Sequence, residues 1–116
     1  MKVESTHSKI TVGEDFIKDY QIVIAESYDP MLARMIQAAP YAPSDAFDSW
    51  EQSIADYIEY HGGSNRITDF LLYEAWWMGK IGPTLAQELI KITPQNHTMY
   101  LLLEDCIESA MPITWE

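Results

Sequence analysis

Residues 44–63 read SDAFDSWEQSIADYIEYHGG, and this stretch predicts an amphipathic helix. Its apolar side chains follow the spacing i, i+3, i+7, i+10, i+11 and are Phe47, Trp50, Ile54, Tyr57 and Ile58. At about 100° per residue they fall within an arc of roughly 100° on one side of a helix. Ser44 is suited to cap the first turn, and Gly62-Gly63 to supply a left-handed exit after Tyr60.

Outward from this helix, proline and capping signals predict four more. Asp29-Pro30 marks a start with proline at the first helical position, and Pro40 ends that helix. The other starts are expected at Ser64 or Asn65, at Gly82-Pro83 and at Thr93-Pro94. The last helix places Met99, Leu102, Leu103 and Cys106 on one face and ends before Pro112.

The first 27 residues favour strands instead. Residues 9–12 and 20–25 are rich in β-branched and aromatic types, and Gly13-Glu14-Asp15 between them suits a turn. We therefore predict an α+β, mostly helical fold, with an N-terminal β-hairpin followed by about five short amphipathic helices. A chain of this length predicts a single domain over residues 1–116, strand-rich over 1–27 and helical over 28–111.

Charge is the unusual property of the composition. Eighteen acids face seven bases, which gives a net charge of −11. A hydrophobic fraction of 47% excludes a disordered acidic tail. Nucleic acid and anionic membranes are poor direct partners because like charges repel, whereas a basic protein is the natural complement.

The acids of residues 44–63 are arranged in a row. Asp45, Asp48, Asp56 and Glu59 gather opposite the apolar stripe, and Glu51 lies at its flank. No base occurs between Arg34 and Arg66, so the usual i,i+4 ion pairs are missing. Five carboxylates over about 21 Å of helix give one charge per about 4–5 Å, close to the one per about 3.4 Å of a DNA strand.

Two further acidic groups could extend this row. Glu104, Asp105 and Glu108 lie on the last predicted helix, and Glu14, Asp15 and Asp19 lie near the predicted hairpin. Several such rows could imitate the two phosphate backbones of duplex DNA. A row of acids is also what an ordinary solvated helix face looks like, and that plainer interpretation stays open.

The remaining chemistry-bearing residues do not suggest catalysis. The histidines, at positions 7, 61 and 97, lack metal-ligand spacing, so we expect no metal and no cofactor. Cys106 is the one cysteine, which excludes an internal disulfide, and its place on an apolar stripe predicts a buried thiol. No nucleophile or phosphate-loop motif occurs, so we expect no enzyme. Residues 1–19 lack the apolar stretch of a signal peptide, which favours the cytoplasm.

Two aromatic residues are candidate anchors for a partner. Trp77, in the Trp76-Trp77 pair, and Tyr60 could lie exposed beside carboxylates, where Trp and Tyr dominate binding hot spots. Core packing is the plainer expectation for both.

In size, charge and the acidic row over residues 45–59, the chain resembles the acidic DNA-mimic inhibitors of bacteria and phages. These include antirestriction proteins, some anti-CRISPR proteins and mimics that bind histone-like proteins. The resemblance implies a non-enzymatic cytoplasmic protein that occupies the basic surface of a DNA- or RNA-binding protein, such as a histone-like protein, repressor or nuclease. An immunity protein for a cognate nuclease toxin, and a helical regulatory or adaptor module whose acidity serves solubility, remain as alternatives.

Overall fold

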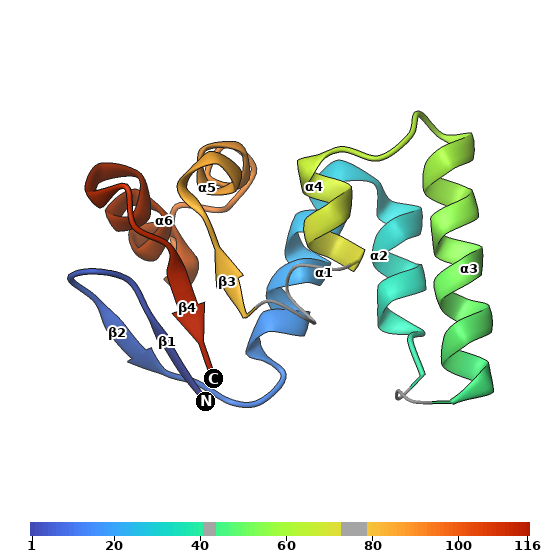
Figure 1. The fold of residues 1–116 in the computed structure, drawn as a ribbon, viewed down its shortest axis with the longest axis horizontal. Helices are drawn as coiled ribbons and strands as arrows, with labels where there is room; N and C mark the ends of the chain where they lie inside the picture. Colours follow the sequence, from blue (N-terminus) through green and yellow to red (C-terminus); the bar gives the residue numbers. More distant parts are fainter. Residues whose placement is uncertain (41–43, 73–78) are drawn as a thin grey trace.

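The computed structural model describes residues 1–40, 44–72 and 79–116, which form a small sheet and a set of helices (Figure 1). The strands are β1 (Lys2–Glu4), β2 (Lys9–Thr11), β3 (Lys80–Ile81) and β4 (Ile113–Trp115). The helices are α1 (Phe16–Tyr28), α2 (Pro30–Gln37), α3 (Asp45–Tyr60), α4 (Arg66–Asp69), α5 (Pro83–Leu89) and α6 (Thr98–Ser109). The predicted α+β, mostly helical fold with an N-terminal β-hairpin is confirmed.

The sheet joins the two ends of the described chain. Its strand order is β2-β1-β4-β3, and every neighbouring pair is antiparallel. Val3 pairs with Ile10 on one side and with Trp115 on the other, so the two termini lie side by side (Figure 1). Gly79 precedes β3 with φ 61°, and a Cβ there would lie 3.2 Å from the Trp115 carbonyl oxygen, which explains the need for glycine.

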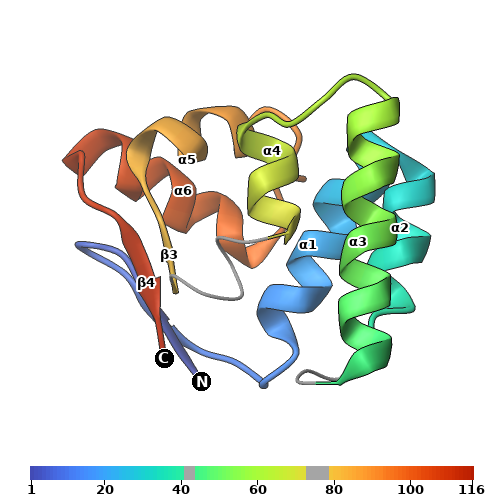
Figure 2. The same cartoon turned by 45° about the vertical axis from the view of Figure 1, so that its right-hand side comes forward.

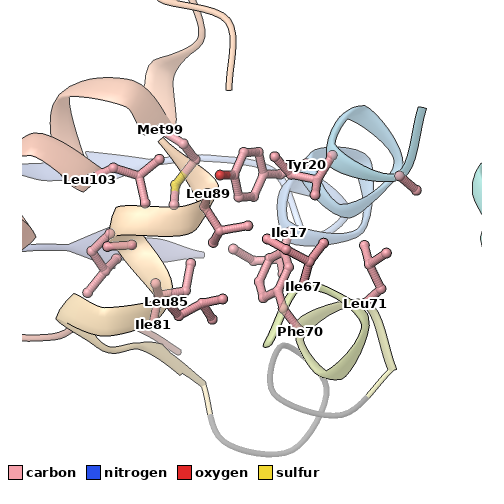
Figure 3. Packing of buried hydrophobic residues seen from close by; sticks show 14 of the residues in the cluster. Ile17, Tyr20, Ile67, Phe70, Leu71, Ile81, Leu85, Leu89, Met99 and Leu103 are labelled. Atoms are coloured by element: carbon pink, nitrogen blue, oxygen red, sulfur yellow. The ribbon is translucent and has the colours of Figure 1, made fainter. Parts of the chain in front are cut away.

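The helices divide between the two ends of the molecule. α5 and α6 lie beside the sheet, whereas α1, α2 and α3 stand together at the other end, with α3 outermost (Figures 1 and 2). Buried side chains from both ends meet between them (Figure 3). This core includes Ile17 and Tyr20 from α1, Phe70 and Leu71 after α4, Ile81 from β3, Leu85 and Leu89 from α5, and Met99 and Leu103 from α6.

The predicted strand over residues 20–25 is wrong, because this segment is the middle of α1. Ile17, Tyr20, Gln21 and Ile24 have the spacing of one helix face, and all four are buried. Core packing of that face outweighs the weak strand preference of the β-branched residues. The hairpin instead pairs β1 with β2, so residues 1–27 are strand-rich only as far as Thr11.

Three helix starts follow the predicted capping residues. Asp29 accepts a hydrogen bond from the Met31 amide, Ser44 from the Phe47 amide and Asn65 from the Thr68 amide. After α3, Gly62 and Gly63 have φ 125° and 84°, which confirms the predicted left-handed exit. The start at Pro83 is also confirmed.

The predicted start at Thr93-Pro94 is wrong, since α6 begins at Thr98 with His97 as its cap. The Thr93 hydroxyl does not cap a helix. It donates to the Leu89 carbonyl oxygen at 2.7 Å and hydrogen-bonds the buried Tyr20 hydroxyl at 2.8 Å. Thr93 therefore joins α1 to the chain after α5.

Candidate protein-interaction surface

Helix α3 is held by its inner face and presents its other face outward. Phe47, Ile54 and Ile58 are buried on the inner side. The Trp50 indole N–H donates to the Met35 carbonyl oxygen at 2.7 Å, and the Tyr57 hydroxyl donates to Asp29 Oδ2 at 2.8 Å. These contacts fix which side of α3 faces solvent.

The outward face of α3 carries four exposed carboxylates. Asp45, Asp48, Asp56 and Glu59 are exposed, whereas Glu51 is half-buried at the flank. At about 100° per residue the four exposed acids fall within an arc of roughly 80°. They form two pairs, one at each end of α3, and we call this set the α3 acidic face. Four charges over about 21 Å of helix give one per about 5–7 Å, sparser than the row expected from sequence and than a DNA strand.

Within the described ranges, none of the acids on the α3 acidic face forms an ion pair. Gln52 Nε2 donates to Asp56 Oδ1 at 2.8 Å, a neutral contact one turn away. Arg66, one of the two bases that flank this stretch in the sequence, lies 3.8 Å from Glu88. The face therefore keeps its negative charge.

The two pairs differ in their effect on α3 itself. Asp45 and Asp48 lie in the first turn, where the helix dipole and the free amides favour negative charge. Glu59 lies in the last turn, which holds no base, and the dipole disfavours an acid there. Helix stability thus explains the first pair but not Glu59.

The predicted second row does not join the α3 acidic face. Glu104 and Glu108 are exposed on α6, which lies at the opposite end of the molecule from α3 (Figures 1 and 2). The two groups of acids therefore do not form one continuous surface.

Asp105, the third member of that row, is occupied within the fold. Its side chain is 12% exposed and accepts from the His7 ring and the His7 amide, both at 2.7 Å. Hydrogen bonds from the Ser5 side chain and from His7 lower the pKa of Asp105 to about 2. We correct its assignment as a phosphate surrogate, since this carboxylate fastens the β1–β2 turn to α6.

The third acidic group lies at the start of α1. Glu14 and Asp15 are exposed just before this helix, and Asp19 is exposed in its first turn. α1 and α3 both begin on the lower side of the view in Figure 1, but α1 begins near the middle of the molecule and α3 at the side away from the sheet. We therefore do not count this group as part of the α3 acidic face.

One candidate aromatic anchor is exposed, and the other lies outside the described residues. Tyr60, at the end of α3, is 85% exposed, whereas Trp77 falls within residues 73–78. Tyr28 and Met31 are each 45% exposed near the α1–α2 junction. The sequence signals did not single out Tyr28 or Met31, because exposure at a helix junction depends on how the helices pack against one another.

The described residues also show where the other reactive groups lie. Cys106 is buried, its thiol lies 3.7 Å from the Ile81 carbonyl oxygen, and burial raises its pKa. Across residues 1–40, 44–72 and 79–116, no three His, Cys, Asp or Glu side chains are grouped so as to hold a metal ion. The same residues contain no helix of the length and apolarity needed to cross a bilayer.

Comparisons with protein-family models, with curated proteins and with solved structures give no match to this chain.

Proposed function

We propose that this chain is a non-enzymatic acidic binding protein that occupies the basic surface of a nucleic-acid-binding protein and blocks it. The α3 acidic face is the surface that makes the contact, and its carboxylates stand where the phosphates of a bound nucleic acid would lie. The observation that carries the proposal is the exposed and unneutralised charge of Asp45, Asp48, Asp56 and Glu59.

Electrostatics supports this class of partner. A surface that binds nucleic acid already has a large favourable interaction with any polyanion, without reading a base sequence. A folded anion can compete for it, and opposite fields also speed the encounter. A net charge of −11 on a chain of 116 residues gives such a field.

The position of Glu59 supports a role beyond helix stability. An acid in the last turn of a helix lowers helix stability, yet Glu59 stands there with Asp56 one turn before it. A basic partner would offset that unfavourable charge. The acids at the start of α3 need no such explanation, so Asp56 and Glu59 are the more informative pair.

The proposal is tested by capture and competition. The tagged chain is used to capture proteins from its native cell, with and without nuclease treatment, and the captured protein is purified. The proposal expects a basic nucleic-acid-binding protein that is retained after nuclease treatment and displaced by duplex DNA. A captured protein that binds this chain and DNA at the same time would contradict it.

Exposed Tyr60 favours an immunity protein as the second candidate. An aromatic side chain that is 85% exposed beside carboxylates is the kind of residue that anchors a tight, specific complex. An immunity protein would bind one nuclease toxin with slow dissociation governed by that anchor. The range of partners and the salt dependence separate the two. Slow, salt-resistant dissociation from a single nuclease supports immunity, whereas salt-sensitive binding of several basic proteins supports mimicry.

A further inference from the structure

The large exposed apolar side chains of the helical end belong to the last residue of α1, the first turn of α2 and the last residue of α3. The described residues include five large hydrophobic side chains that are exposed: Tyr28, Met31, Tyr60, Leu101 and Met111. The first three are these side chains, which we call the Tyr60 surface. Its elements meet at the same end of the molecule (Figures 1 and 2).

Hydrogen bonds fix the arrangement of these elements. Asp29 accepts from the Met31 amide at 3.0 Å and from the Tyr57 hydroxyl at 2.8 Å, which ties the start of α2 to the last turn of α3. Asn65 Nδ2 donates to the Tyr28 hydroxyl at 2.7 Å. These bonds connect the start of α2 and the end of α1 to the last turn of α3 and the residue before α4, while the apolar side chains of the Tyr60 surface stay exposed to solvent.

Tyr60 stands beside two of the exposed acids. It follows Glu59 directly and lies four residues after Asp56, so Asp56 and Tyr60 share one side of α3. The His61 ring makes an edge contact with the Tyr60 ring, with centroids 5.0 Å apart at 73°. The nearest base in the sequence, Arg66, is within 4 Å of Glu88 and not of these acids.

An aromatic ring next to carboxylates matches the chemistry of an arginine side chain. The guanidinium group is planar, stacks on aromatic faces and donates paired hydrogen bonds to a carboxylate. A lysine ammonium can supply the charge but does not match both features. Exposed apolar side chains beside the pair would receive an apolar neighbour of that arginine.

Because the Tyr60 surface joins an exposed aromatic to two unneutralised acids, we propose that it binds an arginine-bearing apolar segment of the basic partner. The guanidinium group stacks on the Tyr60 ring and pairs with the carboxylate of Asp56 or Glu59. The apolar side chain next to it packs on Met31 and Tyr28. The inference rests on the proposed function, since it names the partner chemistry that one end of the α3 acidic face selects.

Synthetic peptides of equal length and charge test this selection. One carries arginine and the other lysine at each basic position, with leucine between them, and binding is followed by fluorescence anisotropy of a labelled peptide. We expect the arginine peptide to bind the native chain roughly two- to five-fold more tightly than the lysine peptide. A third peptide with arginine spaced by glycine should bind more weakly than its leucine counterpart.

Matched variants assign the selectivity to the Tyr60 surface. Tyr60→Phe keeps the ring and should keep the arginine preference, whereas Tyr60→Ser should abolish it. Met31→Ser should remove the advantage of leucine over glycine and leave the arginine preference unchanged. These side chains are exposed, and urea unfolding checks that each variant stays folded.

The outcomes separate the inference from the function on which it rests. Salt-sensitive binding of both peptides with equal affinity, or an arginine preference that survives Tyr60→Ser, would reject the Tyr60 surface alone. Binding of neither peptide at low salt would reject the surface together with the proposed function.

Discussion

The Glu59→Gln variant should be more stable than the Asp48→Asn variant. Both variants lose one negative charge from an exposed side chain of α3. They therefore relieve the self-repulsion of a chain at −11 by a similar amount, and that shared effect is stabilising. What differs is the position of the two acids along the helix.

The helix dipole sets the size of the difference. A charge in the first or last turn of an exposed helix contributes roughly 0.3–1 kcal/mol at low ionic strength. Asp48 lies in the first turn and Glu59 in the last, where no base stands. The two variants should thus differ by about 0.6–2 kcal/mol in the free energy of unfolding, which corresponds to melting temperatures roughly 2–8 °C apart.

Urea unfolding at low salt measures this difference. The slopes of the unfolding free energy against urea should agree for the native chain and both variants, so that only the midpoints move. The difference should shrink in high salt, because exposed charges are screened. If Glu59→Gln unfolds at lower urea than Asp48→Asn, then Glu59 stabilises α3 and the argument that it stands there for a partner fails.

Three further predictions follow from single contacts. Trp50→Phe removes the indole donor from the Met35 carbonyl oxygen at the end of α2. Urea unfolding should show that the free energy of unfolding falls by about 1–3 kcal/mol. An unchanged free energy of unfolding would mean that this bond does not hold α3. The pKa of Asp105 is lowered from 3.8 to about 2, so its contribution is present above pH 3.8 and is lost as the pH falls toward 2. The Asp105→Asn variant should therefore be less stable than the native chain at neutral pH. In an acid titration followed by circular dichroism, its stability should also fall less between pH 4 and 2. Burial lowers the pKa of His97 below 6.5, so the free energy of unfolding should decline as the pH falls below 6.5. His97→Asn keeps a capping side chain on α6 and should remove that decline. A variant with the pH profile of the native chain would show that His97 is not its source.

Local signals in the sequence located most of the helices. The cap at Ser44 and the two glycines after Tyr60 act within a few residues, so the bounds of α3 could be predicted without knowing what it packs against. The same holds for Asp29 before α2 and Asn65 before α4.

The errors arose where a distant contact decides the structure. Residues 20–25 have the composition of a strand, but Tyr20 and Ile24 become helical because they share a face that packs on the core. Thr93 has the local look of a helix cap, yet its hydroxyl bonds Tyr20, which lies 73 positions away in the chain. The strands β3 and β4 have two and three residues, too few for a periodic pattern, and they form by pairing with each other and with β1.

The candidate site shows the same division. The side of α3 that carries Asp45, Asp48, Asp56 and Glu59 could be predicted because helical spacing alone determines it. The hydrogen bonds to the Asp105 carboxylate could not be predicted, because their donors, Ser5 and His7, lie at the other end of the chain. The separation of α3 from α6 also depends on the whole fold, and no pattern within either helix records it.

Equilibrium binding of the captured partner by two charge-matched variants tests the α3 acidic face most directly. One variant carries Asp48→Asn, Asp56→Asn and Glu59→Gln on α3. The control carries Glu4→Gln, Glu104→Gln and Glu108→Gln, which are exposed on β1 and α6. Dissociation constants are measured over a series of salt concentrations.

The α3 variant should bind much more weakly than the native chain and lose part of its salt dependence, whereas the control should bind nearly as the native chain does. Equal weakening by both variants would mean that net charge alone attracts the partner. An α3 variant that binds like the native chain would contradict the assignment of this face.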